Sequence, residues 1–470
     1  MADTNAQLTE LLKALDAPQH RIGVLNRYYR GDQSLSFMAP EVAKALGDRF
    51  PRLTVNYVRL AVNSIAERLR VTGFEGGNVW EDVWLANDLD QRSALVHREA
   101  LLTGAGYVSV WSNPDGSPRV AVESCRQVVT QVDPGSRETV AAVKRWTDSA
   151  RGQTHAVLYL PDRVERYVAD QSGAAGPALR LIETLDNPLG QVPIVAFRNS
   201  DLPLDDGVSE VADLRCLVDA LSKLTADLMV ASEYGARPRR YVTGFGPEER
   251  EKRDPATGAV VVDPGTGEPV MEVVNPFPET DRMMLVEPAD AKVGQLAGAS
   301  LDGYRNAVDV ILSEIAAVSC LPPHYLGVLH SNPTSADALR ASEAGLTAKA
   351  SAKQSAFGQS WEQVMRLAVG VRDRVDPATV RIRARWNDPA TRSVAQEADA
   401  AQKLYAAQLL SRKGTLRRMG LSEDEIAEEL QETFDEMQSE ATAKSDPALF
   451  RYLQEMNNGG ALKAPGNEAA

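Results

Sequence analysis

The stretch that decides the fold is Leu321–Leu339, LPPHYLGVLHSNPTSADAL, which joins two long helical patterns through a proline-rich turn. Before it, apolar residues recur every three or four positions from 301 to 318, which predicts one face of a helix. Pro322 and Pro323 lack the amide donor of a helix, and their rings clash with the preceding turn. We therefore expect the first helix to end near Cys320.

A second helix is expected after the turn. Thr334 and Asp337 fit a capping box, in which a hydroxyl and a carboxylate each satisfy a free backbone amide of the first turn. No proline follows before Val371, so at about 1.5 Å per residue the helix would be roughly 55 Å long. Its middle, 341–360, is small and polar, as in a helix that bridges solvent, and Gly345 and Gly358 are the two candidates for a bend.

Size and composition indicate an ordinary folded protein. The chain has 470 residues and a mass of 51.0 kDa, enough for about three domains. Its 43% hydrophobic and 25% charged residues exclude wholesale disorder. It has no run of eighteen apolar residues and no signal-like start, so we expect a soluble, unexported protein without membrane contact.

Charge and cysteine usage narrow the function. The net charge of −14 argues against tight DNA binding, because affinity for duplex DNA comes largely from Lys and Arg. The three cysteines, Cys125, Cys216 and Cys320, are too few and too far apart for a disulfide framework, and we expect reduced core thiols.

The N-terminal half mixes helices with strands. A leucine stripe at residues 8–15 and apolar periodicity at 55–69 predict helices, and a further helical segment is expected around 41–46. Gly104 and Gly106 lack the third glycine of a dinucleotide site and precede a strand, so they indicate a strand entry. Alternating runs then predict a sheet of short antiparallel strands at 107–111, 119–123, 128–132, 139–146 and 155–159.

Two helices flank an insertion in the middle of the chain. The periodicity predicts helices over 208–231 and 301–319, and Asp219 and Lys223 are spaced for an ion pair. Between them, turn sequences begin at Asp254 and Asp263 and flank a short strand at 259–262, with 270–274 as its partner. This pattern predicts an exposed β-hairpin carried by the two helices. The two helices alone cannot bury both of their apolar faces against each other, so part of that apolar surface would stay uncovered.

The C-terminal part is helical and acidic. Arg381, Arg383 and Arg385 share one face of a strand over 380–386, where they would pair with acidic neighbours or, less simply, contact DNA. Helices are expected over 394–410 and 422–437, the latter opened by a capping box of Ser422 and Glu425. Residues 422–440 carry nine acids and no base, and the tail from 457 is expected to be disordered.

Catalytic signatures are missing from the sequence. We find no phosphate-binding GxxxxGK[ST], HExxH, paired Cys-x-x-Cys or GxSxG motif. The five histidines include one close pair, His324 and His330, at a spacing that does not place two ligands on one helical face. We therefore expect no enzyme activity, no metal and no cofactor.

The chain resembles the portal proteins of tailed double-stranded DNA bacteriophages, from about Leu25 to about Glu429. The resemblance is carried by the helix, PPHYLG turn, NPTSADAL restart and second helix, together with four other segments. Those segments are YYRGD at 28–32, VNYVRLAVNSIAERLRVTGF at 55–74, ALLTGAGYVSV at 100–110 and NPLGQVPIVAFRN at 187–199. The motifs are specific through their order and spacing.

The resemblance implies an α+β, mainly helical portal fold with the following parts. They are an N-terminal wing of helices and antiparallel sheet (1–207), a first stem helix (208–232), a clip (233–300), a second stem helix (301–320), a channel loop (321–335), a long wing helix and strand (336–393), and crown helices with a disordered tail (394–470). The wing, stem, clip and crown would be arranged around a central DNA channel.

The resemblance also implies the sites. The channel-facing loop would be Leu329, His330, Ser331, Asn332, Pro333 and Thr334. The docking hairpin would span Pro247 to Pro278 and include Pro247, Asp254, Val260, Asp263, Val270 and Val274. A ring of twelve subunits at one capsid vertex would serve genome packaging and ejection. Its partners would be the terminase large subunit, the major capsid and scaffold proteins, the head–tail adaptors, and duplex DNA bound without sequence specificity. It would assemble in the host cytoplasm and remain in the virion.

Two other functions fit parts of the pattern. Another virion structural protein, such as a minor head or tail connector protein, would share the acidic, helix-rich composition but gives no reason for the helix, hairpin, helix, loop, long-helix order. A packaging enzyme would need a phosphate-binding loop and a metal-binding acidic cluster, which the sequence lacks.

Overall fold

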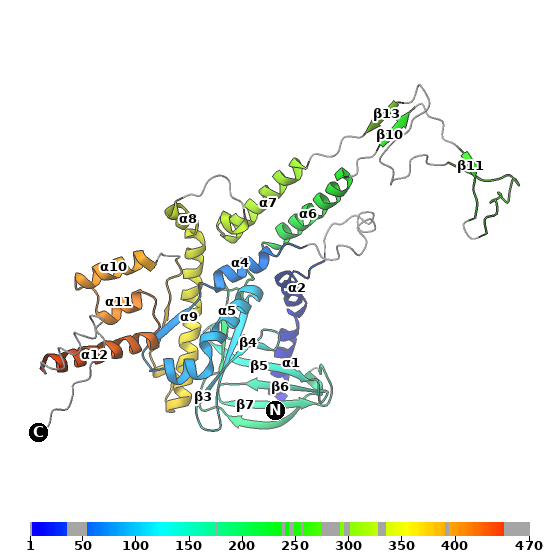
Figure 1. The fold of residues 1–470 in the computed structure, drawn as a ribbon. Helices are drawn as coiled ribbons and strands as arrows, with labels where there is room; N and C mark the ends of the chain where they lie inside the picture. Colours follow the sequence, from blue (N-terminus) through cyan, green and yellow to red (C-terminus); the bar gives the residue numbers. More distant parts are fainter. Residues whose placement is uncertain are drawn as a thin grey trace, which may run out of the picture. The chain divides into compact units, whose positions relative to one another are not determined.

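The computed structural model describes residues 2–34, 54–174, 176–236, 240–243, 249–254, 257–273, 292–295, 301–327, 335–390 and 394–445. They form two compact units, the first within 1–36, 54–222 and 309–470 and the second within 37–53 and 223–308. The boundary passes through helices α6 (Arg215–Ala236) and α7 (Asp302–Ser319). The predicted class, α+β and mainly helical, is confirmed (Figure 1).

A five-stranded antiparallel sheet lies in the first unit. Its strands run in the order β4 (Val128–Val132), β5 (Thr139–Asp148), β6 (Gln153–Tyr159), β7 (Arg163–Ala169) and β8 (Arg180–Asp186). Helix α1 (Ala2–Asp16) covers one face with the leucine stripe, whose members Leu8 and Leu15 are each 1% exposed. The stripe meets the alternate residues of β5 and β6, as the period of two requires.

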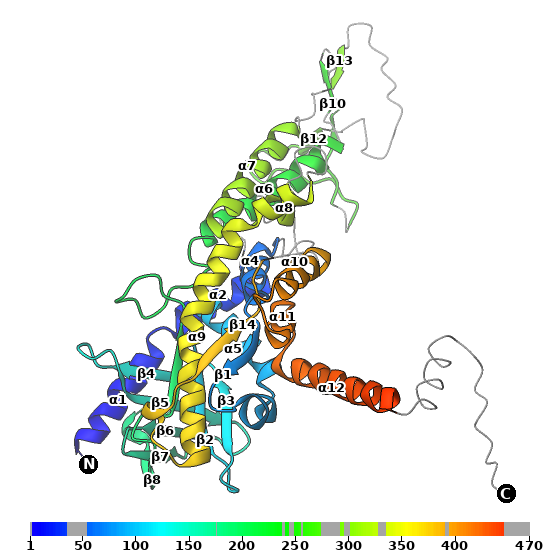
Figure 2. The same ribbon diagram turned by 90° about the vertical axis from the view of Figure 1, so that its left-hand side faces the viewer.

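A second, three-stranded sheet has the order β3 (Pro118–Glu123), β2 (Ala105–Ser112), β9 (Ile194–Arg198). Helices α5 (Leu89–Thr103) and the long α9 (Ala344–Asp373) pack on it, α4 (Tyr57–Ala66) packs on α5 and α9, and α2 (Gln19–Arg30) packs on α4 and α5 (Figure 2). Strand β1 (Val71–Glu75) pairs with the distant β14 (Arg383–Trp386). Sequence alone did not indicate that pairing.

At the GxG that begins β2, the backbone at Gly104 passes close to the backbone at Gly207. Gly104 has a φ of 101°, and a Cβ there would lie 2.6 Å from the carbonyl oxygen of Gly207. Gly106 is equally restricted, because its Cβ would lie 2.8 Å from the Val96 side chain. The glycines therefore permit packing, which agrees with a strand entry.

The centre of the first unit is an aromatic cluster around His97 of α5. The imidazole is fully buried, and its Nε2 accepts a 2.8 Å hydrogen bond from the indole N–H of Trp361 on α9. The ring stacks on Phe357 at 5.5 Å, and Trp361 meets Phe197 and Trp84 at 4.8 Å each. Burial lowers the pKa of His97 to about 3, so the imidazole is neutral at neutral pH.

Helix α6 begins later than predicted, at Arg215 instead of residue 208. The amides of Val208 and Glu210 donate to the carbonyls of Asn199 and Leu101 instead of to carbonyls within a helix.

The predicted ion pair of Asp219 with Lys223 is also wrong. Asp219 accepts from the Tyr28 hydroxyl at 2.8 Å, and Lys223 pairs with Asp227 one turn further on.

The cysteine prediction holds for one residue. Cys125 is buried, its thiol donates to Thr103 at 3.3 Å, and burial raises the pKa of the thiol to about 12. Cys216 and Cys320 are exposed, so their prediction as core thiols is wrong. The apolar periodicity of their helices does not reveal which side of each helix is covered.

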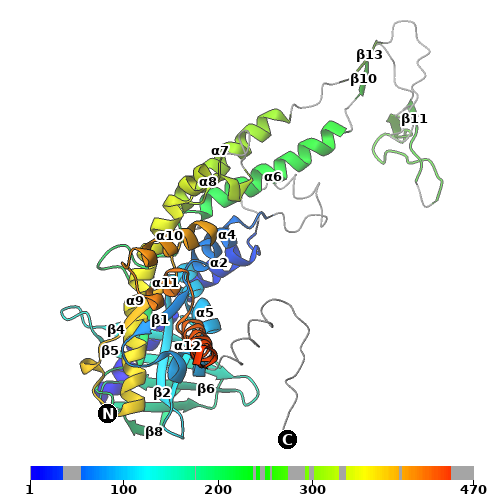
Figure 3. The ribbon, with the colours of Figure 1, turned by 60° about the vertical axis from the view of Figure 1, so that its left-hand side comes forward.

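The C-terminal helices α10 (Val394–Ala406), α11 (Arg412–Arg418) and α12 (Glu423–Ser445) follow one another in contact (Figure 3). One half of the predicted capping box of α12 is confirmed, because the Glu425 carboxylate accepts from the amide of Ser422 at 2.7 Å, whereas the Ser422 hydroxyl donates to the same carboxylate at 2.8 Å. The indole of Trp80, in the π-helical turn Trp80–Trp84, donates to Asp424 at 3.0 Å and ties α12 to the sheet domain.

His97 makes the stability of this core depend on pH. Unfolding restores an ordinary histidine pKa of about 6.5, so between pH 3 and 6.5 the unfolded chain binds the extra proton and acid destabilises the fold. The slope is about 1.4 kcal/mol per pH unit. We expect His97→Gln, which keeps an acceptor for Trp361, to remove about 2 kcal/mol of the stability difference between pH 7.5 and pH 5.

Urea unfolding of the unassembled subunit at both pH values measures this difference. His20→Gln, on an exposed position of α2, is the matched control and should leave the difference unchanged. Equal pH dependence in wild type and His97→Gln would contradict the assignment.

Candidate functional site: loop anchor and hairpin

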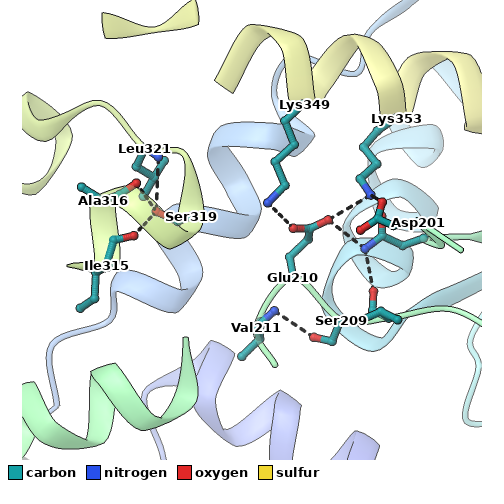
Figure 4. A network of polar contacts seen from close by, with 12 residues as sticks. Asp201, Ser209, Glu210, Val211, Ile315, Ala316, Ser319, Leu321, Lys349 and Lys353 are labelled. Carbon is teal, nitrogen blue, oxygen red and sulfur yellow. Dashed lines mark hydrogen bonds and ion pairs between the residues drawn. The ribbon is translucent and has the colours of Figure 1, made fainter. Parts of the chain in front are cut away.

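Helix α7 ends where the prolines predicted. Its last residue is Ser319, and Cys320 adopts a left-handed conformation with φ of 61°. The Ser319 hydroxyl donates to the carbonyl of Ile315 at 2.5 Å and accepts from the amide of Leu321 at 3.3 Å, which closes the helix end (Figure 4). A 3₁₀ turn, η5 (Pro323–Leu326), and a left-handed Gly327 then lead out of the helix.

The six residues predicted to face the channel, Leu329–Thr334, lie outside the described residues. The chain is described again from Ser335, which caps α8 (Ala336–Ser342) by accepting from the amide of Ala338 at 3.3 Å. The predicted capping residue, Thr334, is therefore off by one position. A serine at the next position supplies the same hydroxyl acceptor, and sequence spacing did not distinguish the two.

The predicted single long helix is interrupted. Helices α8 and α9 are separated by Glu343, whose backbone lies at φ −85° and ψ −5°. Its carboxylate makes no cap for α9 and instead faces side chains from two other segments. Gly345, two residues later, lowers the cost of a break here.

A largely buried cluster around Glu343 joins η5, just before the loop, to the start of α9. Arg68, at the end of α4, places its Nη2 3.4 Å from the carboxylate of Glu343 and donates to the hydroxyl of Tyr325 at 3.1 Å. Tyr325 and His324, both in η5, lie 3.5 Å and 3.7 Å from the same carboxylate. The Arg68 and Glu343 side chains are 12% and 11% exposed. We call these four residues the loop anchor.

The loop anchor is held together by ionic and hydrogen-bond contacts. The guanidinium of Arg68 is held on α4 by a 2.9 Å bond to the carbonyl of Ser64, so its position is set before it reaches Glu343. Largely excluded from water, the pair attracts more strongly than a surface pair would. The chain therefore leaves for the loop at Gly327 directly after a segment held by this pair.

A second polar network fixes α9 just beyond the anchor. The carboxylate of Glu210 forms ion pairs with the Nζ of Lys349 at 2.5 Å and the Nζ of Lys353 at 3.3 Å. The Nζ of Lys353 also forms an ion pair with Asp201 at 2.9 Å (Figure 4). Burial raises the pKa of Glu210, but Lys349 and the amide of Asn199 outweigh it, and the pKa stays below its ordinary value. Glu210 is thus ionised and paired.

Buried polar residues in the middle of α9 correct the interpretation of a solvent-bridging helix. Lys353 and Gln354 are 4% and 7% exposed. Gln354 donates to the carbonyls of Arg68 at 2.8 Å and Asn387 at 2.9 Å, so it bridges the segments that directly follow α4 and β14. In the sequence, the polar character of these side chains indicated exposure to solvent, and only the fold supplies their buried hydrogen-bond and ionic partners.

The pairing of Arg385 with Glu75 on β1 matches the prediction of acidic neighbours.

The second unit contains the predicted hairpin. Strands β11 (Glu249–Glu251) and β12 (Met271–Val273) pair, and the chain between them folds back twice, with Arg253 opposite Val260 and Val262 opposite Pro269. Asp254 and Asp263 begin the two turns, in which the amides of Gly258 and Gly267 each donate to the aspartate carbonyl at 2.8 Å. Strands β10 (Arg240–Thr243) and β13 (Lys292–Gln295) pair separately.

Three segments thus replace the two strands that the sequence predicted. The amide of Val270 donates to the carbonyl of Val261 at 2.9 Å, and Val260 and Val270 are half-buried. Val262 and Met271 are 47% and 49% exposed, which leaves apolar side chains open on this hairpin. Pro247 and Val274 lie outside the described residues.

The described residues contain no group of three or more His, Cys, Asp or Glu placed to hold a metal ion. Among the same residues, no helix has both the length and the apolar character needed to cross a membrane.

Comparisons with known proteins give one consistent family. Residues 10–443 match the family model described as phage portal protein, SPP1 Gp6-like. The portal protein of Mycobacterium phage D29 is 30% identical over 431 residues, covering 86% of this chain and 83% of that protein. The portal protein of Mycobacterium phage L5 is 32% identical over 378 residues, covering 75% and 72%.

Among solved structures, a chain from the neck of an empty gene transfer agent particle is similar with a TM-score of 0.45 and 15% identity, covering 82% of this chain and 95% of that one. The family model and the two phage relatives establish membership. The chain therefore belongs to the SPP1 Gp6-like family of phage portal proteins, structural proteins that form the portal ring at one vertex of the capsid.

Proposed function

We propose that twelve copies of this chain close the ring, that residues Leu329–Thr334 of each copy line its DNA channel, and that the hairpin unit docks the terminase large subunit and later the head–tail adaptors. The loop anchor carries the proposal. Because Glu343 contacts both η5 and Arg68, the segment that leads into the loop at Gly327 is fixed to the start of α9 and to the segment after α4. A channel loop needs such a base to stay in place while DNA moves.

The surface of α7 supports ring closure. Val310 and Val318, eight residues apart, are 58% and 45% exposed. An open hollow of about 430 Å³ on the same helix is lined by Asp309, Val310, Ser313, Glu314 and Ala317. Apolar surface of this kind is stabilised when a neighbouring subunit covers it. The same assembly would contact the major capsid and scaffold proteins as the head forms in the host cytoplasm.

The charge of the chain supports passage of DNA without sequence-specific binding. At a net charge of −14 per subunit, a ring offers few cationic contacts that could trap phosphates. The exposed Val262 and Met271 suit the hairpin to a protein partner instead of DNA. ATP hydrolysis would then belong to the motor, and the portal would supply position and shape.

Particle mass tests the ring. Twelve chains of 51.0 kDa should give a species of roughly 600 kDa in mass photometry of the purified protein. Assembly with scaffold present is the control for a chain that needs help to close. A protein that stays monomeric under both conditions would contradict the ring.

Deletion of Leu329–Asn332 tests the channel loop. We expect rings to form as in wild type, because the loop anchor remains, while the yield of filled heads falls at least about tenfold for lack of the channel contact. Packaged DNA protected from nuclease measures the effect. Full packaging by intact mutant rings would remove the proposed role of the loop.

Arg68→Met tests the anchor itself. It leaves Glu343 largely buried without its guanidinium, which we expect to cost about 2 kcal/mol and to speed hydrogen exchange in η5 and at the start of α9. Arg92→Met is the matched control, since Arg92 pairs with Asp88 on the surface and such pairs contribute little. Equal exchange in the two variants would show that the pair does not hold the loop base.

A further inference from the structure

Three arginines lie in a row along the outward face of the β1–β14 ladder. Arg381, Arg383 and Arg385 alternate with apolar residues, as the period of two in a strand requires. Ile382, between the first two, is 4% exposed, whereas Arg381 and Arg383 are both exposed. We call Arg381, Arg383 and Arg385 the arginine row.

The inward face of the same ladder is fixed against α9. Trp386 packs on Gly358 of that helix, where an added Cβ would lie 3.1 Å from the indole nitrogen, and its ring lies 5.6 Å from that of His97. The amide of Ala384 donates to the carboxylate of Glu362 on α9 at 3.3 Å. The backbone that carries the arginine row is therefore held in place, so a ligand would bind there without first ordering a loop.

The arginine row keeps positive charge that the subunit does not neutralise. Arg385 pairs with Glu75 on β1. Arg381 and Arg383 form no ion pair with any residue in the part of the chain that the structure describes. Two cations are thus left open at one place on a subunit whose net charge is −14.

The outward face of the ladder offers charge without apolar surface. Besides the arginine row, the register places on it Gly73, opposite Arg385, and Glu75, opposite Arg383. Neither adds an apolar or aromatic side chain. The core of a protein–protein interface is depleted of charge, and single-stranded nucleic acids stack on aromatic rings, whereas a duplex is held through its phosphates by cations. The composition of this face therefore favours a duplex over either other partner.

The spacing and the chemistry of the arginine row both suit phosphates. Alternate residues of a strand lie about 6.6 Å apart, so the row is about 13 Å long. Over that length one strand of duplex DNA carries about four phosphates. A guanidinium donates two parallel hydrogen bonds to a phosphate, which an ammonium group cannot do. The arginine row can therefore follow a stretch of one DNA strand.

We propose that the arginine row binds the phosphate backbone of duplex DNA without reading its sequence. With only two unpaired arginines the contact is weak and sensitive to salt, so the DNA is held briefly and released. The inference rests on the proposed function for the choice of DNA as the polyanion. It deepens that function, because it adds a DNA contact outside the channel loop Leu329–Thr334.

DNA binding by the full chain tests the arginine row. In fluorescence anisotropy with a short labelled duplex, the logarithm of the wild-type affinity should fall linearly with the logarithm of salt concentration, with a slope of about −2 to −3. Arg381→Gln with Arg383→Gln should reduce the magnitude of the slope by about 2 and lower the affinity at low salt at least about tenfold.

Two further variants make the result specific. Arg119→Gln with Arg126→Gln is the matched control, because both arginines are exposed and the change in net charge is the same. It should leave the affinity within about twofold of wild type. Arg381→Lys with Arg383→Lys keeps the charge and should retain the slope while losing about threefold in affinity, which separates the guanidinium from any loss of folding.

Each other result has a definite meaning. Equal slopes in wild type and the double glutamine variant would overturn the assignment, and so would an equal loss in the matched control, because overall charge would then explain the binding. Inorganic phosphate that displaces the duplex better than chloride does at equal ionic strength would indicate a pocket for free phosphate instead of a duplex contact. Tighter binding of poly-glutamate than of DNA would indicate an acidic protein partner and overturn the proposal.

Deletion of Leu329–Asn332 separates the two DNA contacts. It should leave this duplex binding unchanged even where it abolishes packaging, so the channel loop and the arginine row can fail independently. Loss of duplex binding in that deletion would place the DNA contact in the channel loop and overturn the arginine row.

Discussion

The contact of Trp361 with His97 is the constraint on which the first unit depends. It joins α9 to α5, through two residues that are 264 positions apart in the chain. Because the imidazole is fully buried, its Nε2 must accept a hydrogen bond, and the indole of Trp361 is placed to donate it. Phe197, Phe357 and Trp84 then fill the space around this pair.

The position of α9 determines where the loop begins and ends. Lys349 and Lys353 bind Glu210, and Gln354 bridges the segments that directly follow α4 and β14, so the first half of α9 is fixed on three sides. Glu343 at its start then meets Arg68 on one of those same supports. Arg68 and Glu343 thereby link η5, which follows α7, to the start of α9.

Charge is distributed unevenly, and the distribution separates two kinds of surface. Inside the first unit, cations and acids are paired at low exposure, as at Glu210 and Glu343. The cations Arg412, Lys413, Arg417 and Arg418 lie on α11, and the acids of 422–440 lie on or just before α12. Ion pairs at an exposed surface contribute little to the stability of a fold.

The sequence by itself determined the family, the class of the fold and the local turns. Pro322 and Pro323 end α7 because proline has no amide to donate, and Asp254 and Asp263 start hairpins because they precede proline and are followed by glycine. Only the tertiary structure decided the break at Glu343, the pairing of β1 with β14, the burial of Lys353 and the exposure of Cys320. These features depend on partners far away in the chain, and helical or strand periodicity describes one face of an element without identifying what covers it.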